Sequence, residues 1–152
     1  MISGRPQRAR VYLHREGSRL IVATVHHNQD GICFEAEAPL SLTRWTDEEL
    51  GDSVKLALEQ SGIVTRDLRK LQQTDWPSFK AGGEPSLRAF QISFIPIEIS
   101  GANEDNLVYT IEGTPANEEE LTVRASVAAQ ASPAEFARLI NRVYQACRDR
   151  RF

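Results

Sequence analysis

The sequence lacks the features that mark membrane-spanning and secreted proteins. No stretch of its 152 residues approaches the roughly 18 consecutive apolar residues that a membrane helix requires. The first ten residues carry Arg5, Arg8 and Arg10 without an apolar run behind them, so they do not have the form of a secretory signal. We therefore expect a soluble protein that resides in the cytoplasm.

Cysteine is also scarce. The chain contains two cysteines, Cys33 and Cys147, which lie far apart in segments with apolar patterns. Free cysteines are often buried and behave as small hydrophobic side chains, and disulfides are rare in reducing compartments. We predict two buried, reduced thiols, and neither has neighbours in the sequence that would activate it as a nucleophile.

The bulk composition excludes a disordered or low-complexity chain. Hydrophobic residues make up 41% and charged residues 26% of the sequence, with 7 prolines and 9 glycines. A chain of this length can bury a substantial core, and it shows no internal repeat and no long linker. We predict one domain over residues 1–152, in which residues 1–9 can be flexible.

Motifs for catalysis and cofactor binding are missing as well. There is no G-x-S-x-G turn, no P-loop and no G-x-G-x-x-G, and no cysteine or histidine pair has zinc-like spacing. His26 and His27 are adjacent, so on a strand they point to opposite faces and cannot bind one metal ion together. We therefore expect no catalytic residues, no metal and no cofactor, and a protein that is not an enzyme.

One pair of carboxylates leaves an alternative open. Glu35 and Glu37 have the spacing that places two side chains on one face of a strand, and paired carboxylates can act in glycoside hydrolysis or hold a metal. The same spacing is ordinary on a strand face exposed to solvent. We favour the second interpretation.

Lysine and arginine are absent between Arg88 and Arg124. This interval holds seven acidic residues, which are Glu98, Glu104, Asp105, Glu112, Glu118, Glu119 and Glu120. Such a block can attract a basic partner and speed its encounter with the protein. The alternative is a solvated surface that keeps the protein soluble.

A basic segment at the N-terminus raises the alternative of nucleic-acid binding. Five arginines and Tyr12 lie within the first twenty residues. The net charge of −3 and the acidic interval argue against a phosphate partner. We therefore predict a protein partner, and no nucleic acid, membrane or small-molecule substrate.

Alternating patterns predict most of the strands. Segments 10–15 and 19–26 read as a hairpin, and shorter strands are expected at 32–37, 107–111 and 121–127. The run 87–100 also alternates, with Phe90, Ile92, Phe94, Ile97 and Ile99 expected inward. Pro96 lies inside this run and cannot donate a hydrogen bond, so we expect an edge position, a bulge or a break there.

Capping signals predict two long helices. Thr46 and Glu49 form a capping box before an apolar stripe that Gly62 ends, with Gly51 allowing another element to approach closely. The start of the last helix is marked by Ser132 as the N-cap, Pro133 at the first helical position and Glu135 as a capping-box glutamate. A helical turn is possible at 66–72. The fold class is α+β: a mainly antiparallel sheet of five or six strands with two main amphipathic helices packed on one face.

The residues 49–61 have the form E-L-G-x-x-V-x-x-A-L-x-x-S, and Pro39 and Leu40 come before them. Trp76-Pro77-Ser78-Phe79, Pro96, Gly101 and Tyr109 follow in order. This order and spacing resemble the bacterial immunity proteins of contact-dependent growth inhibition systems. The resemblance covers most of the chain, although the tail after Gly113 departs from it.

The resemblance implies a specific function. Such proteins bind the toxic C-terminal domain of a cognate effector in the cytoplasm and block its activity, and many of these toxins are nucleases with basic substrate grooves. An acidic surface would suit a basic partner. The family shares no catalytic residues that could be carried over to this chain.

Candidate partner-binding residues therefore come from the acidic interval and from one aromatic loop residue. They are Glu98, Glu104, Asp105, Glu118, Glu119, Glu120 and Trp76. Trp76 can be either an interface anchor or a buried plug. The alternative function is a non-enzymatic adaptor or chaperone-like module that binds an unrelated partner.

Overall fold

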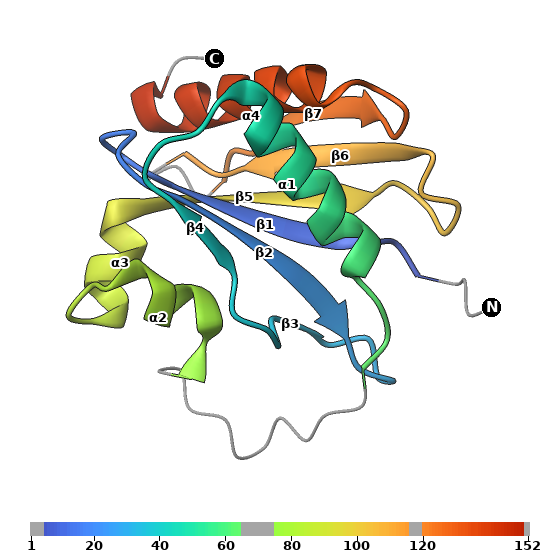
Figure 1. Cartoon of the computed structure of the whole chain (residues 1–152), viewed down its shortest axis with the longest axis horizontal. Helices are drawn as coiled ribbons and strands as arrows, with labels where there is room; N and C mark the ends of the chain where they lie inside the picture. The colour runs from blue at the N-terminus through green and yellow to red at the C-terminus, as the bar shows by residue number, and fades with distance from the viewer. Residues whose placement is uncertain (1–4, 65–74, 116–119, 151–152) are drawn as a thin grey trace.

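The computed structural model describes residues 5–64, 75–115 and 120–150. Strands and helices follow one another along these residues as shown in Figure 1. In chain order they are β1 (Arg8–His14), β2 (Leu20–His27), β3 (Cys33–Phe34), β4 (Leu40–Leu42), α1 (Asp47–Gln60), α2 (Pro77–Gly82), α3 (Leu87–Ser93), β5 (Phe94–Gly101), β6 (Val108–Gly113), β7 (Val123–Ala128) and α4 (Pro133–Asp149).

The strands form one 7-stranded sheet. Its order is β3-β2-β1-β5-β6-β7, with β4 also paired to β2, and every pairing between these strands is antiparallel. The predicted hairpin is confirmed as β1 and β2, and β1 lies between β2 and β5 in the sheet. The predicted α+β class with a mainly antiparallel sheet is therefore confirmed.

The two long helices cover one face of this sheet (Figure 1). Val11 of β1, Val22 of β2 and Ile97 of β5 are opposite one another in the strand register, and all three point into the main core. Leu50 of α1 and Phe136 of α4 are fully buried in the same core. The prediction of two amphipathic helices on one face is confirmed.

The opposite face carries two short helices that the sequence analysis did not predict. Tyr12 and Ile21 alternate with the core residues of β1 and β2, so their side chains point away from α1 and α4. They join Phe90 and Phe94 in a second, smaller core, against which Trp76 packs. The α2 and α3 helices thus cover the β1–β2 half of this face.

Both long helices begin as predicted. The Thr46 hydroxyl accepts from the Glu49 N–H at 3.1 Å, and the Glu49 carboxylate accepts from the Thr46 N–H at 3.2 Å, which completes the capping box. The helix ends at Gln60, two residues before Gly62. Ser132 caps α4 as predicted. Glu135 was expected to complete a capping box, but its carboxylate accepts from the guanidinium of Arg138 instead.

The prediction of one strand over 87–100 is wrong for its first half, which is α3. Ser86 caps this helix by accepting from the Ala89 N–H at 3.1 Å. Phe90 and Phe94 are four residues apart and stack at 5.0 Å in the smaller core, whereas Ile92 is 57% exposed. The alternation of apolar residues was therefore a helical spacing in this segment.

Pro96 lies in β5, an internal strand of the sheet, but the pairing there is one-sided, which agrees with the predicted edge position. Its register partner is Tyr12 of β1, and the pairing of β5 with β6 begins only at Ile97. Of the described strands, β1 alone is opposite Pro96. The proline nitrogen, which cannot donate a hydrogen bond, is tolerated here because β6 does not pair with β5 at this position.

Four smaller predictions also change. The strand expected at 32–37 is confined to Cys33–Phe34, and Trp76, which was expected in a loop, is the N-cap residue of α2. The helical turn expected at 66–72 lies outside the described residues. Both cysteines are free, but only Cys147 is buried, while Cys33 is half-buried. Arg8 and Ala9, from the segment expected to be flexible, lie in β1.

Candidate functional site

The predicted acidic residues that the structure describes do not form one patch. Glu104 and Asp105 are exposed in the connection between β5 and β6, and Glu120 is exposed before β7. These two positions lie at opposite ends of β6, a six-residue strand, so roughly 20 Å of strand separates them. Glu118 and Glu119 lie outside the described residues.

The remaining acids of this interval are paired with arginines on the sheet. Arg10, Glu98, Glu112 and Arg124 are register partners in a row across β1, β5, β6 and β7, on the face opposite α1 and α4. Glu98 lies 2.6 Å from Arg10, and Glu112 lies 2.6 Å from Arg124. Burial alone would lower the pKa of Arg10, but the charge of Glu98 and its hydrogen bond with Arg10 raise it, and the net result is a pKa above the ordinary value. The row carries two charges of each sign, so it is not an acidic surface.

Trp76 belongs to the smaller core. Its indole Nε1–H donates to Glu35 at 2.8 Å, and its ring contacts those of Tyr12 and Phe90 at centroid distances of 5.7 and 5.2 Å. The side chain remains half-buried. These contacts explain the position of Trp76 within the fold without a partner protein. Its role as a partner-binding residue stays a prediction.

Glu35 is the most constrained polar residue in the described structure. Its side chain is fully buried and accepts hydrogen bonds from the Tyr12 hydroxyl at 2.6 Å, the Trp76 indole, and the N–H and hydroxyl of Ser78 at 3.1 and 2.5 Å. Arg10 Nη1 lies 3.6 Å away. Burial, followed by the charge of Glu35, raises the pKa of Tyr12. With its oxygens occupied in this way, Glu35 fastens α2 to the sheet.

The structure does not bring Glu35 and Glu37 together. Glu37 has a 63% exposed side chain and accepts from His26 Nε2 at 2.7 Å, while the other ring nitrogen of His26 accepts from the Gly62 N–H at 3.2 Å. The two carboxylates therefore bind different partners. No group of three or more histidine, cysteine or acidic side chains that could hold a metal is found among the described residues.

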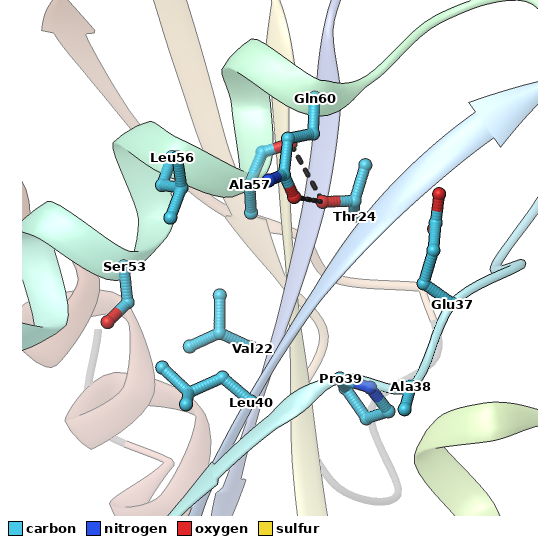
Figure 2. Close-up of a pocket in the computed structure, with 10 residues that line it drawn as sticks. All are labelled: Val22, Thr24, Glu37, Ala38, Pro39, Leu40, Ser53, Leu56, Ala57 and Gln60. Carbon is cyan, nitrogen blue, oxygen red and sulfur yellow. Dashed lines mark hydrogen bonds between the residues drawn. The ribbon is translucent and has the colours of Figure 1, made fainter.

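A groove between α1 and β4 is a concave surface that the sequence analysis missed. One wall is α1, the other is the segment from Glu37 to β4, and β2 forms the floor (Figure 2). We call it the α1–β4 groove. It measures about 350 Å³. Its lining residues are Val22, Thr24, Glu37, Ala38, Pro39, Leu40, Ser53, Leu56, Ala57 and Gln60.

Two leucines stand exposed at the mouth of this groove. Leu40 is 46% exposed and Leu56 is 55% exposed. Leu56 lies off the apolar stripe of α1, and an apolar residue on the polar face of a helix is the sequence signal that could have pointed to this surface. The groove has no lysine or arginine among its lining residues.

The exposed surface of α1 is acidic. By helical spacing, Asp52 and Glu59 share the face of Leu56, four residues before it and three after it. Lys55, the single cation of α1, is turned away from solvent: its ammonium donates to the Ala131 carbonyl and lies 5.2 Å from the centre of the Phe136 ring. Asp52 and Glu59 thus give the exposed surface of α1 a negative charge next to Leu56.

None of the described helices has the length and apolar character needed to cross a membrane. The sequence matches no protein-family model and no curated protein.

Two solved structures share the fold. One is a protein of unknown function from Neisseria meningitidis, with a TM-score of 0.71 and 17% identity over 97% of this chain and 98% of that chain. The other is a chain of the CdiA-CT/CdiI toxin and immunity complex from Yersinia pseudotuberculosis, with a TM-score of 0.67 and 16% identity over 93% of this chain and 97% of that chain. At these identities the likeness shows the fold alone.

Proposed function

We propose that this protein is an immunity protein that binds and neutralises the C-terminal toxin domain of a contact-dependent inhibition effector in the cytoplasm. The observation that carries the proposal is the likeness of its fold, over nearly the whole of both chains, to a chain of a toxin and immunity complex. Such a protein acts by binding, so it requires a surface that fits the toxin and no catalytic residues.

The described surface supports a binding role. The α1–β4 groove has an apolar lining that includes one acidic residue, Glu37, and the exposed acids Asp52 and Glu59 lie on α1 next to Leu56, outside the lining. Many protein interfaces combine an apolar centre with polar surroundings. If the toxin is a nuclease, its substrate groove is basic, and complementary charge would speed its association with an acidic surface. Because this charge complementarity fits a toxin with a basic groove, we propose a nuclease as the toxin class.

The acidic residues of the 98–120 interval remain proposed contacts. Because the exposed and described members, Glu104 and Asp105 on the one hand and Glu120 on the other, lie at opposite ends of β6, the interval is best tested as two separate groups. One variant reverses Glu104 and Asp105 to lysine, and the other reverses Glu118, Glu119 and Glu120. A partner that contacts one end should associate more slowly with only one of these two variants.

A growth assay tests the function. The toxin domain of the effector encoded beside this protein is induced in cells that do or do not express the protein, and an unrelated acidic protein serves as the control. We expect growth to be restored by this protein and not by the control. Failure to restore growth, with both proteins soluble and expressed, would overturn the proposal and favour the adaptor alternative.

Direct binding separates neutralisation from indirect protection. A catalytically inactive variant of the same toxin domain is mixed with this protein, and the complex is measured by size-exclusion chromatography and titration calorimetry. We expect a stoichiometric complex. Protection without a complex would contradict neutralisation by binding.

A further inference from the structure

We propose that the α1–β4 groove is the docking site for the toxin domain, and that the toxin fills it with a basic segment carrying one large apolar side chain. This inference rests on the proposed function and assigns its surface and the chemistry of its partner. It adds a contact surface outside the 98–120 interval, which the sequence analysis did not identify.

The apolar half of the inference rests on Leu40 and Leu56. They face the same groove from opposite walls, and each leaves about half of its surface in water (Figure 2). Pro39 and Ala57 continue the apolar lining, and Val22 forms the floor. Covering these side chains with a partner removes apolar surface from water at roughly 25 cal/mol per Å².

The size of the groove limits what can enter it. Its volume of about 350 Å³ lies at the lower end of the range of roughly 300–1,000 Å³ for ligand pockets. That space accepts one large side chain and does not accept a whole helix. Interfaces commonly place an aromatic or arginine anchor in such a pocket.

The charge around the groove identifies the neighbours of that side chain. Glu37 lines one wall with a 63% exposed side chain, and Asp52 and Glu59 are exposed beside Leu56. Lys55 is engaged with the Ala131 carbonyl on the α4 side. A partner with lysine or arginine next to its apolar side chain would complement this rim, whereas an acidic partner would be repelled.

The walls of the groove are fixed in place. The Thr24 hydroxyl on the floor donates to the Ala57 carbonyl of α1 at 3.0 Å, as Figure 2 shows. Leu40 pairs with Val22 in the sheet, and Glu37 is held by His26. Because the site is formed before binding, little ordering opposes the association.

The first test replaces the two leucines. Leu40→Asp and Leu56→Asp are combined, and Ile92→Asp is the matched control, since Ile92 is 57% exposed on α3 outside the groove. Affinity for the inactive toxin domain is measured by calorimetry, and folding is checked by circular dichroism. We expect the double variant to lose at least about 30-fold in affinity, the effect of one interface hot spot, and the control to bind like wild type.

The second test reverses the charge of the rim. Asp52→Lys and Glu59→Lys are combined and compared with Glu16→Lys, which changes an exposed acid in the β1–β2 turn. We expect the rim variant to associate more slowly with the toxin domain and to depend less on salt. The control should keep the rate and the salt dependence of wild type.

The outcomes separate this inference from the proposed function. If wild type does not bind the toxin domain, the proposed function is wrong and the inference falls with it. If wild type binds and the leucine variant binds as tightly, only the docking site is overturned. A wild-type dimer that the leucine variant dissociates would assign the groove to a second copy of the chain and overturn the inference as well.

Discussion

At the scale of the residue, Glu35 shows how a charge is kept inside this fold. Its carboxylate has lost all contact with water, which carries a large desolvation cost. Hydrogen bonds from Tyr12, Trp76 and Ser78 replace that water, and Arg10 lies close enough to offset the charge. Because Tyr12 lies in β1, while Trp76 and Ser78 lie at the start of α2, this buried carboxylate fixes the position of α2 on the sheet.

Removing this carboxylate should destabilise the protein strongly. Glu35→Ala leaves the donors of Tyr12, Trp76 and Ser78 without an acceptor, and we expect a loss of about 2–4 kcal/mol in the free energy of unfolding. Urea denaturation measures the change. Glu37→Ala is the control, because the Glu37 side chain is 63% exposed and its hydrogen bond with His26 should contribute about 1 kcal/mol. Equal losses for the two variants would contradict the structural role of Glu35.

His27 makes the stability depend on pH. Its side chain is 4% exposed, and burial, followed by the charges of Arg5, Arg8 and His26, lowers its pKa below the ordinary value of 6.5. The folded state therefore resists the proton that the unfolded chain accepts. The stabilisation is present above pH 6.5 and is lost as the pH falls from that value through the folded pKa.

Urea midpoints at about pH 7.5 and 5.5 test this dependence. Wild type should lose more stability between the two values than His27→Gln, which has no proton to bind. Other groups titrate equally in both proteins, so the difference between the two losses isolates His27. Identical losses would show that His27 has the same proton affinity in the folded and unfolded states.

At the scale of the element, one glycine determines how closely the long helices approach. A Cβ built on Gly51 of α1 would lie 1.9 Å from the carbonyl oxygen of Pro133, at the first turn of α4. The obstacle is backbone, so no side chain can move aside. The sequence analysis predicted a close approach at Gly51, and the structure confirms it.

Gly51→Ala should therefore destabilise the protein despite its better helix propensity. Overpacking should cost more than the roughly 1 kcal/mol that alanine gains over glycine in a helix. We therefore expect a net loss of about 1–3 kcal/mol in the free energy of unfolding. Thermal unfolding measures it. Gly62→Ala is the matched control, because nothing lies within 4 Å of its added Cβ. An unchanged or raised melting temperature for Gly51→Ala would show that α1 and α4 can separate freely.

Elements with strong local signals could be predicted from the sequence. The caps at Thr46 and Ser132 involve residues within one turn, so their effect is visible in a short window. The α3 helix was missed because Phe90 and Phe94 fit both periods over so short a run. Ser86 at its N-terminus was the available signal.

Charge could not be assigned to a surface from the sequence. Glu98 meets Arg10 because β1 and β5 are neighbours, although 88 residues separate them along the chain. The same holds for Glu35, whose donors come from distant segments at Tyr12 and Ser78. Such pairings depend on strand order and register, which no short window contains.

At the scale of the whole molecule, the two faces of the sheet are buried by unequal cores. The main core under α1 and α4 draws buried residues from both helices and from strands across the sheet. The smaller core under α2 and α3 has five buried residues, which are Tyr12, Ile21, Ala23, Phe90 and Phe94. The α2–α3 layer therefore has less buried apolar surface to hold it closed.

Hydrogen exchange should reveal this inequality. The Lys80 N–H bonds to the Trp76 carbonyl in α2, and the Phe90 N–H bonds to the Ser86 carbonyl in α3. We expect both amides to exchange through local opening, at a lower free energy than the Ile140 amide inside α4. Exchange at the same free energy for all three amides would show that the layers open only together.

The Glu35→Ala variant links the two ends of this argument. Because Glu35 binds Ser78 and Trp76 at the start of α2, its loss should lower the opening free energy of the Lys80 amide to a value well below that of wild type. The amides of α4 exchange through global unfolding, so their opening free energy should fall by the amount that urea denaturation measures. A fall of the same size at Lys80 would show that the contacts of Glu35 are already broken when α2 detaches from the sheet. An unchanged opening free energy at Lys80 would show that α2 opens without breaking these contacts, and that Glu35 does not hold α2 to the sheet.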